Sequence, residues 1–460
     1  MNNENSNYLF CMKTWLYPLI LIAVLVVAFF LFKPRIAVHY YEKGRSMADS
    51  SRFEEAVKQY DRALWLDDAR PEFYTAKGLA LDSLNEYEQA IDLYSRSLKM
   101  DSTQSPVYFY RGMTHTDLEN YAPAIYDFSN AIELNPDYTG AWYQRGLARM
   151  QRSNYKDAVE DFTRVIGLDD SFADAYFKRG ASYRELGEKE KAVDDYSKAL
   201  DLGKEALSVY QQRVKALEDV KNYQEAIRDY SRIIELGGGN QQLYYQRGYM
   251  RFLINRYKEA IPDFSKVLEY ENDHRDALYY RAHAYSQVRQ YEKALEDFTK
   301  VIQMEPENPK LWFNRGLARM HLGQFQASEK DLRQTLDLKP DHEKAHFLLG
   351  MALANLKDHG EAIDHYSQAI ELDSTYKQAY YYRGVAKGIQ SQHEEAIDDY
   401  SRAIALDSSY AMAYYNRGIS TVAINQFADG CQDFYQALDL GFEPAQKMIE
   451  TYCKNHPRKQ

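Results

Sequence analysis

The chain has 460 residues, of which 27% are charged and 45% hydrophobic, and its formal net charge is −11 at pH 7. This acidic balance argues against general affinity for nucleic acid, which requires a basic surface. Three cysteines in a chain of this length exclude a disulfide framework as the basis of the fold.

The N-terminal region is predicted to hold a membrane-spanning helix over residues 15–32, after a short polar tail over residues 1–14. The sequence WLYPLILIAVLVVAFFLF is 18 residues without a charge, and as a helix it rises about 27 Å, close to the hydrocarbon core of a bilayer. Trp15 and Tyr17 stand at one edge of the run, where amphipathic rings prefer to lie.

A cleaved secretion signal is the alternative interpretation of this run. A signal peptide needs a small-residue cleavage site after its apolar stretch, but Lys33, Pro34 and Arg35 follow Phe32. The sequence therefore favours an uncleaved, single-pass anchor in a plasma or inner membrane. Residues 33–36 are predicted to be a linker, so the rest of the chain begins at the membrane surface.

The charges that flank the span bear on its orientation. Lys33, Arg35, Lys43 and Arg45 follow the span, and only Lys13 precedes it. By the positive-inside rule this favours a cytoplasmic location for the region after the span, although a long soluble domain weakens that rule.

Residues 37–444 consist of twelve consecutive repeats of 34 residues without an insertion, as in Lys377–Tyr410, KQAYYYRGVAKGIQSQHEEAIDDYSRAIALDSSY. We number positions within each repeat from Ala37. Position 8 is glycine except at Val214 and Ala282, position 20 is a small residue, and position 24 is a ring except at Leu332. Apolar residues recur at spacings of three and four, which predicts a helix A over positions 2–14 and a helix B over positions 15–28. A fixed period of this length indicates a solenoid.

These recurring positions resemble the tetratricopeptide repeat. The resemblance implies an all-α fold, a right-handed α-solenoid of twelve helix-turn-helix repeats. It also implies that partners bind the concave face, which positions 2, 5, 9, 12 and 13 of helix A would line. Residues 445–460 are predicted to form a capping helix and a basic tail, because the last helix B would otherwise expose its apolar side.

Position 7 and position 23 change together along the chain. Nine repeats carry arginine at position 7 and aspartate at position 23, and the other three repeats lack both. We therefore predict structural ion pairs between helices A and B of one repeat, where a planar guanidinium suits a bidentate carboxylate contact. The predicted pairs are Arg111–Asp127, Arg145–Asp161, Arg179–Asp195, Arg213–Asp229, Arg247–Asp263, Arg281–Asp297, Arg315–Asp331, Arg383–Asp399 and Arg417–Asp433.

The concave positions differ between the two halves of the array. In repeats one to six they carry acids, namely Asp49, Asp82, Asp117, Glu185, Glu218 and Asp219. In repeats seven to twelve they are aromatic or apolar, which predicts a groove for a protein or peptide. The predicted partner-binding residues are Tyr245, Tyr249, Phe252, Leu253, Tyr279, Phe313, Leu317, Met320, Met351, Tyr381, Val385, Ile389, Ile419 and Val422. The alternative is that the face assignment slips by one position and that these side chains belong to the core.

No motif in the sequence indicates catalysis. A glycine-rich phosphate loop, a nucleophile elbow and a paired metal motif are all missing. His342, His346, His359 and His365 cluster around repeat ten, but they lack the spacing of a zinc site. We therefore expect no catalytic residue, no metal, no cofactor and no small-molecule substrate.

Cys431 and Cys453 fall on the last helix B and on the predicted cap. A disulfide there would close a loop of about twenty residues, worth roughly 3 kcal/mol. Such an ending resembles those of some bacterial exported repeat proteins and favours an oxidising compartment, against the flanking charges. Two free buried thiols are the other possibility, and both interpretations stay open.

These features together predict a membrane-tethered scaffold that binds a protein or peptide in its concave groove. An architectural spacer, or a subunit of an assembly factor without a groove of its own, is the alternative. An enzyme is least expected, because no stretch outside the repeats is long enough for a catalytic module.

Overall fold

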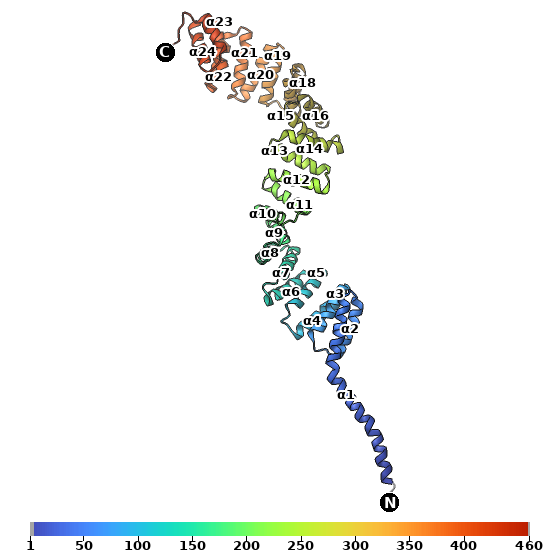
Figure 1. Ribbon diagram of the computed structural model, residues 1–460. Helices are drawn as coiled ribbons and strands as arrows, with labels where there is room; N and C mark the ends of the chain where they lie inside the picture. Colours follow the sequence, from blue (N-terminus) through green and yellow to red (C-terminus); the bar gives the residue numbers. More distant parts are fainter. Residues whose placement is uncertain (1–3, 459–460) are drawn as a thin grey trace. The chain divides into compact units, whose positions relative to one another are not determined.

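The computed structural model describes residues 4–458, with side chains from Ile20 onward, and within that range it contains 25 α-helices and no strand. The chain divides into two compact units, Met1–Ile233 and Ile234–Gln460, which we describe separately (Figure 1). The all-helical solenoid expected from the repeat is confirmed.

In the first compact unit each repeat is one antiparallel helix pair, and each pair packs on the next (Figure 1). Its helices are α1 (Glu4–Asp49), α2 (Phe53–Leu66), α3 (Pro71–Ser83), α4 (Tyr87–Met100), α5 (Ser105–Asp117), α6 (Tyr121–Leu134), α7 (Thr139–Gln151), α8 (Tyr155–Leu168), α9 (Ala173–Glu185), α10 (Lys189–Asp201), α11 (Leu207–Asp219) and α12 (Tyr223–Gly237).

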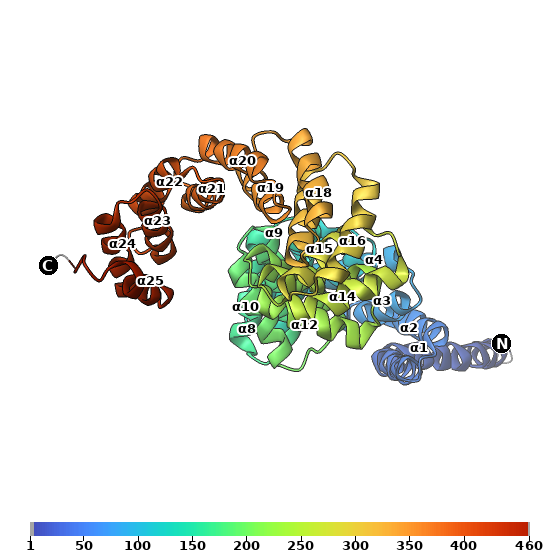
Figure 2. The same ribbon diagram turned by 90° about the horizontal axis from the view of Figure 1, so that it is seen from above.

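The second compact unit continues the pattern, and Figure 2 shows its last helix pairs from above. Its helices are α13 (Gln241–Leu253), α14 (Tyr257–Tyr270), α15 (Arg275–Gln287), α16 (Tyr291–Met304), α17 (Pro309–His321), α18 (Phe325–Leu338), α19 (Glu343–Asn355), α20 (His359–Leu372), α21 (Lys377–Ile389), α22 (His393–Leu406), α23 (Ala411–Ala423), α24 (Phe427–Asp439) and α25 (Pro444–Tyr452).

Helix α1 corrects the expected linker. It runs without a break through the predicted span, through residues 33–36 and through the first helix A. Pro34 lies inside this helix, although proline removes one backbone hydrogen bond there. By length and composition α1 could cross a membrane. A membrane anchor and a secretion signal both have this property.

Helix B begins two positions later than predicted, at position 17, as in α4. The residue at position 15 has a positive φ in all twelve repeats, for example 60° at Asn85 and 79° at Gly187. The following amide of Glu86 donates to the carbonyl of Leu81 at 2.9 Å, as in a left-handed helix termination. This turn takes the two residues that the periodicity had assigned to helix B.

The glycine at position 8 lets helix A approach the ring at position 24. A Cβ added at Gly112 would lie 2.7 Å from Cε1 of Phe128, and that ring is fully buried. In repeat nine the partner is Leu332, and a Cβ at Gly316 would lie 3.1 Å from its Cγ. The contact at 3.1 Å requires only a small shift of the leucine, whereas the contact at 2.7 Å requires the enclosed ring to move further.

We expect Gly112→Ala to destabilise the protein by about 1–2 kcal/mol, because overpacking outweighs the helix propensity of alanine. Gly316→Ala is the matched control and should be neutral or slightly stabilising. Chemical denaturation followed by circular dichroism measures both variants. Equal effects of the two would contradict the proposed contact between glycine and ring.

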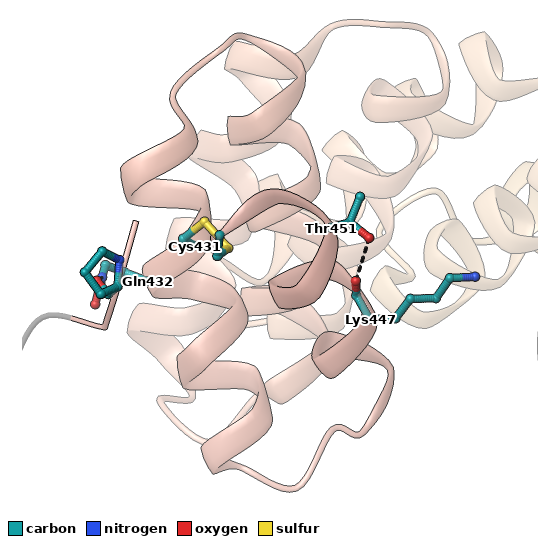
Figure 3. The surroundings of a disulfide bond; sticks show 6 residues. Cys431, Gln432, Lys447 and Thr451 are labelled. Atoms are coloured by element: carbon teal, nitrogen blue, oxygen red, sulfur yellow. Dashed lines mark hydrogen bonds between the residues drawn. A yellow bond between two sulfur atoms is a disulfide. The ribbon is translucent and has the colours of Figure 1, made fainter. Parts of the chain in front are cut away.

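The C-terminal cap is fastened by a disulfide. Cys431 on α24 and Cys453 at the end of α25 are bonded, with their Cα atoms 5.6 Å apart (Figure 3). Both cysteines are buried in a cluster with Phe434, Ala437 and Ala445. The bond closes a loop with a sequence separation of 22 residues, so it disfavours the unfolded chain by about 3 kcal/mol.

Candidate functional site

All nine predicted ion pairs between positions 7 and 23 are present in the structure, each within one repeat. In repeat nine Arg315 donates from Nε and Nη2 to the two carboxylate oxygens of Asp331, at 2.9 and 2.7 Å. All nine aspartates are buried. Such a bidentate contact sets how helix A lies on helix B.

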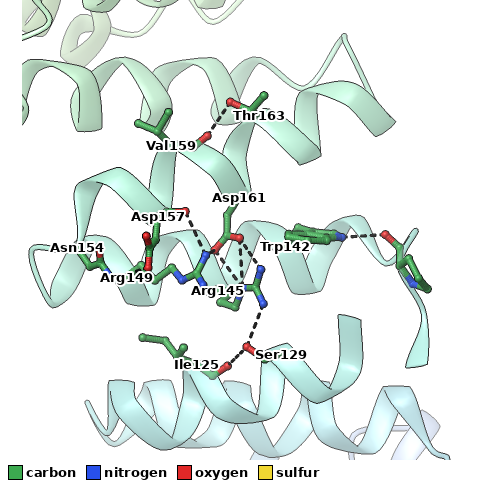
Figure 4. Close-up of polar contacts among 11 residues, drawn as sticks. Ile125, Ser129, Trp142, Arg145, Arg149, Asn154, Asp157, Val159, Asp161 and Thr163 are labelled. Carbon is green, nitrogen blue, oxygen red and sulfur yellow. Dashed lines mark hydrogen bonds and ion pairs between the residues drawn. The ribbon is translucent and has the colours of Figure 1, made fainter. Parts of the chain in front are cut away.

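The arginine has a further partner that sequence reasoning missed. Arg145 donates from Nη1 to Oγ of Ser129 at 3.0 Å, and Ser129 lies on helix B of the preceding repeat (Figure 4). Arginines of other repeats make the same contact, with Ser95, Thr163, Ser197, Ser265, Thr299, Ser367 and Ser401. The guanidinium therefore joins two repeats as well as two helices.

A sequence signal for this contact existed at position 25. Serine or threonine stands there in every repeat that precedes an arginine repeat, whereas Asp61 and Arg333 precede the lysine of repeat two and the leucine of repeat ten. In repeat two, Lys77 forms an ion pair with Asp61 at 2.6 Å. The junction thus keeps a polar contact where its residues change.

The same aspartate takes a second cation in several repeats. Arg149 lies 2.7 Å from Asp161, and Figure 4 shows it beside Arg145. The guanidinium of Arg145 also lies 4.6 Å from the ring centroid of Trp142. Burial raises the pKa of the Asp161 carboxyl, while hydrogen bonds and charge from Arg145 and Arg149 oppose the increase. These groups are enclosed by packing, which suits a structural role.

In repeat ten Leu349 and His365 occupy the positions of the ion pair, and His365 contacts a second histidine, His346. Nδ1 of His346 lies 3.0 Å from Nδ1 of His365, and Nε2 of His346 lies 3.0 Å from the carbonyl of Pro340. Burial lowers the pKa of both imidazoles. Across the described residues, no group of three or more His, Cys, Asp or Glu could hold a metal ion.

Three of the predicted partner-binding residues meet in one pocket of about 220 Å³ in the second compact unit. Met351 lines it from α19, and Val385 and Ile389 line it from α21. The rings of Tyr366 and Tyr382 also line the pocket. Ile389 is 59% exposed, so an apolar side chain lies at the surface beside this pocket.

The pocket recurs at another junction of repeats. A pocket of about 380 Å³ between repeats eight and nine is lined by residues at the same repeat positions, and it includes the predicted residue Leu317. His283 and His321 replace the apolar residues found at Met351 and Ile389. The same hollow between neighbouring A helices is therefore present at two junctions, and its chemistry differs with the residues at positions 9 and 13.

Other predicted residues serve mainly in packing, which corrects part of the expected groove. Tyr381 is buried, its ring packs against Tyr400 and Tyr410, and its hydroxyl accepts a hydrogen bond from Asn416. The other predicted rings at position 5 are half-buried and also pack locally, Tyr245 on His274, Tyr279 on His283 and Phe313 on His342. These rings therefore support the turn or helix beside them.

Side chains at position 12 also pack partly between helices A and B. Phe252 contacts the rings of Tyr257 and Tyr280, and a Cβ at Gly430 would lie 2.8 Å from Cγ2 of Val422. The remaining predicted residues Tyr249, Met320 and Ile419 are half-buried, and Leu253 is 39% exposed. The exposed apolar surface of the predicted groove is thus centred on position 13 and on the hollows between A helices.

The acids of the first six repeats are partly compensated. Thr114 donates to Asp82, and Lys189 lies 3.5 Å from Asp219. Burial raises the pKa of the Asp82 carboxyl, against the hydrogen bond from Thr114. Asp49 and Asp117 are exposed. The acidic character of this half is therefore carried by fewer free carboxylates than the sequence suggested.

The fold and its repeated hollows define a helical repeat scaffold, and sequence profiles place it in a family. Profiles described as tetratricopeptide repeat match residues 41–105, 109–171, 143–206, 241–274, 281–353 and 343–376, and a profile described as TPR repeat matches residues 389–421. The chain belongs to the tetratricopeptide repeat family, whose members are typically scaffolds for protein interaction. Curated protein sequences include no match to the chain.

Several solved structures are similar to parts of the chain. YrrB, described as a TPR protein with an unusual peptide-binding site, is 25% identical over 40% of this chain and 92% of its own, with a TM-score of 0.35. A MamA fragment from Desulfovibrio magneticus RS-1 is 23% identical over 38% of this chain and 98% of its own, with a TM-score of 0.35. A tetratricopeptide repeat protein from Parabacteroides merdae is 17% identical over 54% of this chain and 99% of its own, with a TM-score of 0.39.

Proposed function

We propose that this protein is a membrane-tethered scaffold that binds an extended peptide or protein segment in the hollows between its A helices. The observation that carries the proposal is the pocket lined by Met351, Val385 and Ile389, whose position recurs between repeats eight and nine. Recurring hollows with different linings suit a partner that places successive side chains in successive hollows. A pure spacer would not need a hollow that combines Met351 and Val385 with the exposed Ile389.

Helix α1 is the proposed tether. It joins the apolar run directly to the first repeat without a flexible segment, so the array starts at the membrane surface. The disulfide between Cys431 and Cys453 favours the oxidising side of that membrane, because structural disulfides persist in such compartments. A long soluble domain can cross the membrane largely regardless of the charges beside its span.

We expect the full chain to stay with the membrane fraction during alkaline extraction, and deletion of residues 1–35 to release a soluble helical protein. Protease should digest the repeats when it is added to cells whose outer membrane has been permeabilised and whose inner membrane is intact. Release of the full chain by alkali would overturn the tether. So would a mature protein from which a signal peptidase has removed the apolar run. Protected repeats would place them in the cytoplasm instead.

Binding itself can be tested with the released fragment as bait for a displayed library of random peptides. A groove should enrich peptides that share a spacing of apolar residues, because the hollows recur at a fixed interval. The spacer alternative predicts no enrichment above that of the unselected library.

A further inference from the structure

One large apolar side chain near the proposed membrane surface is left uncovered. Trp65, near the end of α2, is 77% exposed, more than any other large hydrophobic side chain among those the structure describes. Isolated exposed apolar residues are common on proteins, so the exposure of Trp65 matters only because of where the fold places it.

The fold turns Trp65 back toward the membrane. Helix α1 leads away from the predicted span to Asp49, and α2 returns antiparallel to it. Ala37 on α1 shares a buried cluster with Ala63 and Leu66 on α2, so the end of α2 lies beside Ala37. Figure 1 shows α2 beside the upper part of α1, next to the stem that projects from the repeats.

The level of Ala37 is close to the lipid headgroups. Ala37 lies five residues beyond Phe32, which is about 8 Å along a helix at roughly 1.5 Å per residue. The headgroup region adds roughly 5–8 Å outside each face of the hydrocarbon core. A tilt of about 20°, which is usual for spanning helices, would lower one side of the first repeat further.

Basic and aromatic residues at this level of the fold suit that environment, although Asp61 and Asp68, which flank Trp65 in the sequence, are exposed acids. Arg35 and Arg62 are exposed and Lys33 is partly exposed. The guanidinium of Arg62 lies 5.6 Å from the ring centroid of Tyr40, and Arg62 stands one helical turn before Trp65. Tryptophan and tyrosine prefer the membrane interface, and nearby Lys and Arg are attracted to anionic lipid.

We propose that the first repeat docks on the headgroup layer of the membrane that α1 crosses, through residues that the fold places at this level: Trp65, Arg62, Tyr40, Lys33 and Arg35. The proposal rests on the tether proposed above. Trp65 inserts between headgroups, the three cations contact lipid phosphates, and the first helix pair is held at a fixed angle to the surface.

The test uses the full chain with Trp65 as its single tryptophan, made by Trp15→Phe, Trp142→Tyr and Trp312→Tyr. Tyrosine already occupies the position of Trp142 in other repeats, as at Tyr108. The protein is reconstituted into vesicles of phosphatidylcholine and phosphatidylglycerol that carry a nitroxide on the headgroup. We expect Trp65 emission to fall by at least about half, because the indole would lie at the depth of the quencher.

The matched control moves the tryptophan to Tyr126, which is 65% exposed on α6. This variant combines Trp65→Phe with Tyr126→Trp and should keep its emission in the same vesicles. Equal emission from both positions, in protein that still resists alkaline extraction, would overturn the docking of the first repeat and leave the tether standing. Release of the protein by alkali would overturn the tether and the docking together.

Discussion

Asp297→Leu should destabilise the protein by about 3–5 kcal/mol, because it leaves the guanidinium of Arg281 in the protein interior without its carboxylate. Asp297 is 2% exposed and accepts hydrogen bonds from Nε and Nη2 of Arg281, both at 2.8 Å. Arg281→Leu should have a comparable cost, since a buried carboxylate then lacks its partner. The double variant should be more stable than the sum of the two single changes predicts.

Repeats two and ten supply the reason for expecting this recovery. Leu93 occupies the aspartate position of repeat two and Leu349 the arginine position of repeat ten, and both leucines are buried, so each position accepts leucine. Replacing a whole buried pair by well-packed apolar residues is often neutral or stabilising. Denaturation of the four members of the cycle, followed by circular dichroism, yields the coupling energy, and strictly additive changes would refute a direct pair.

A surface ion pair is the control for this cycle. Lys266 and Glu269 lie on α14 with side chains 45% and 63% exposed. Their replacement by alanine should leave the denaturation midpoint nearly unchanged, because exposed pairs are screened by water and salt. The comparison separates the effect of burial from the effect of charge. Ser265→Ala tests the contact between repeats, because the Ser265 hydroxyl accepts a hydrogen bond from Nη1 of Arg281 at 3.1 Å.

The features that the sequence predicted well are those repeated with the same chemistry. Twelve copies of one period predicted the helix pairs, and the joint loss of arginine and aspartate in three repeats predicted the ion pairs. The contact to position 25 was not predicted, because the joint loss of arginine and aspartate points to a partner within one repeat, whereas this contact joins neighbouring repeats. The substitution of Asp61 and Arg333 for serine or threonine carried the missing signal.

Other features could not be predicted from the sequence, because the same residue type occurs in two different environments. The left-handed turn at position 15 is occupied by Ser51, Glu119 and Arg289 as well as by glycine, so no residue type marks it. An aromatic ring at position 5 can face a groove or the next helix, and Tyr381 shows the second arrangement. The stretch 33–36 contains a proline and charges that are typical of linkers, yet it continues the helix.

Changing Met351, Val385 and Ile389 together to serine should weaken binding of a selected peptide by more than about 100-fold, because a few central apolar anchors carry about 2 kcal/mol or more each. All three residues line the same pocket. Titration of the peptide against the fragment without residues 1–35 measures the loss, and circular dichroism checks that helical content is kept.

A substitution at one exposed residue shows whether weaker binding results from the lost contact or from unfolding of the protein. Ile389 is 59% exposed, so Ile389→Glu should disturb little of the core and still block an apolar contact. Leu372→Glu is its matched control, since Leu372 is 44% exposed at the end of helix B in the neighbouring repeat and does not line the pocket. The groove requires that the first change weaken binding and that the second leave it unchanged.

The acidic concave face of repeats one to six is the alternative binding surface. Asp49→Asn and Asp117→Asn remove exposed charges from the first three repeats, and exposed charges change association rates more than they hold a complex together. For an apolar groove these two changes should alter only the salt dependence of binding. If they abolish binding while the serine variant binds normally, the working surface is the acidic half and its partner is a basic segment.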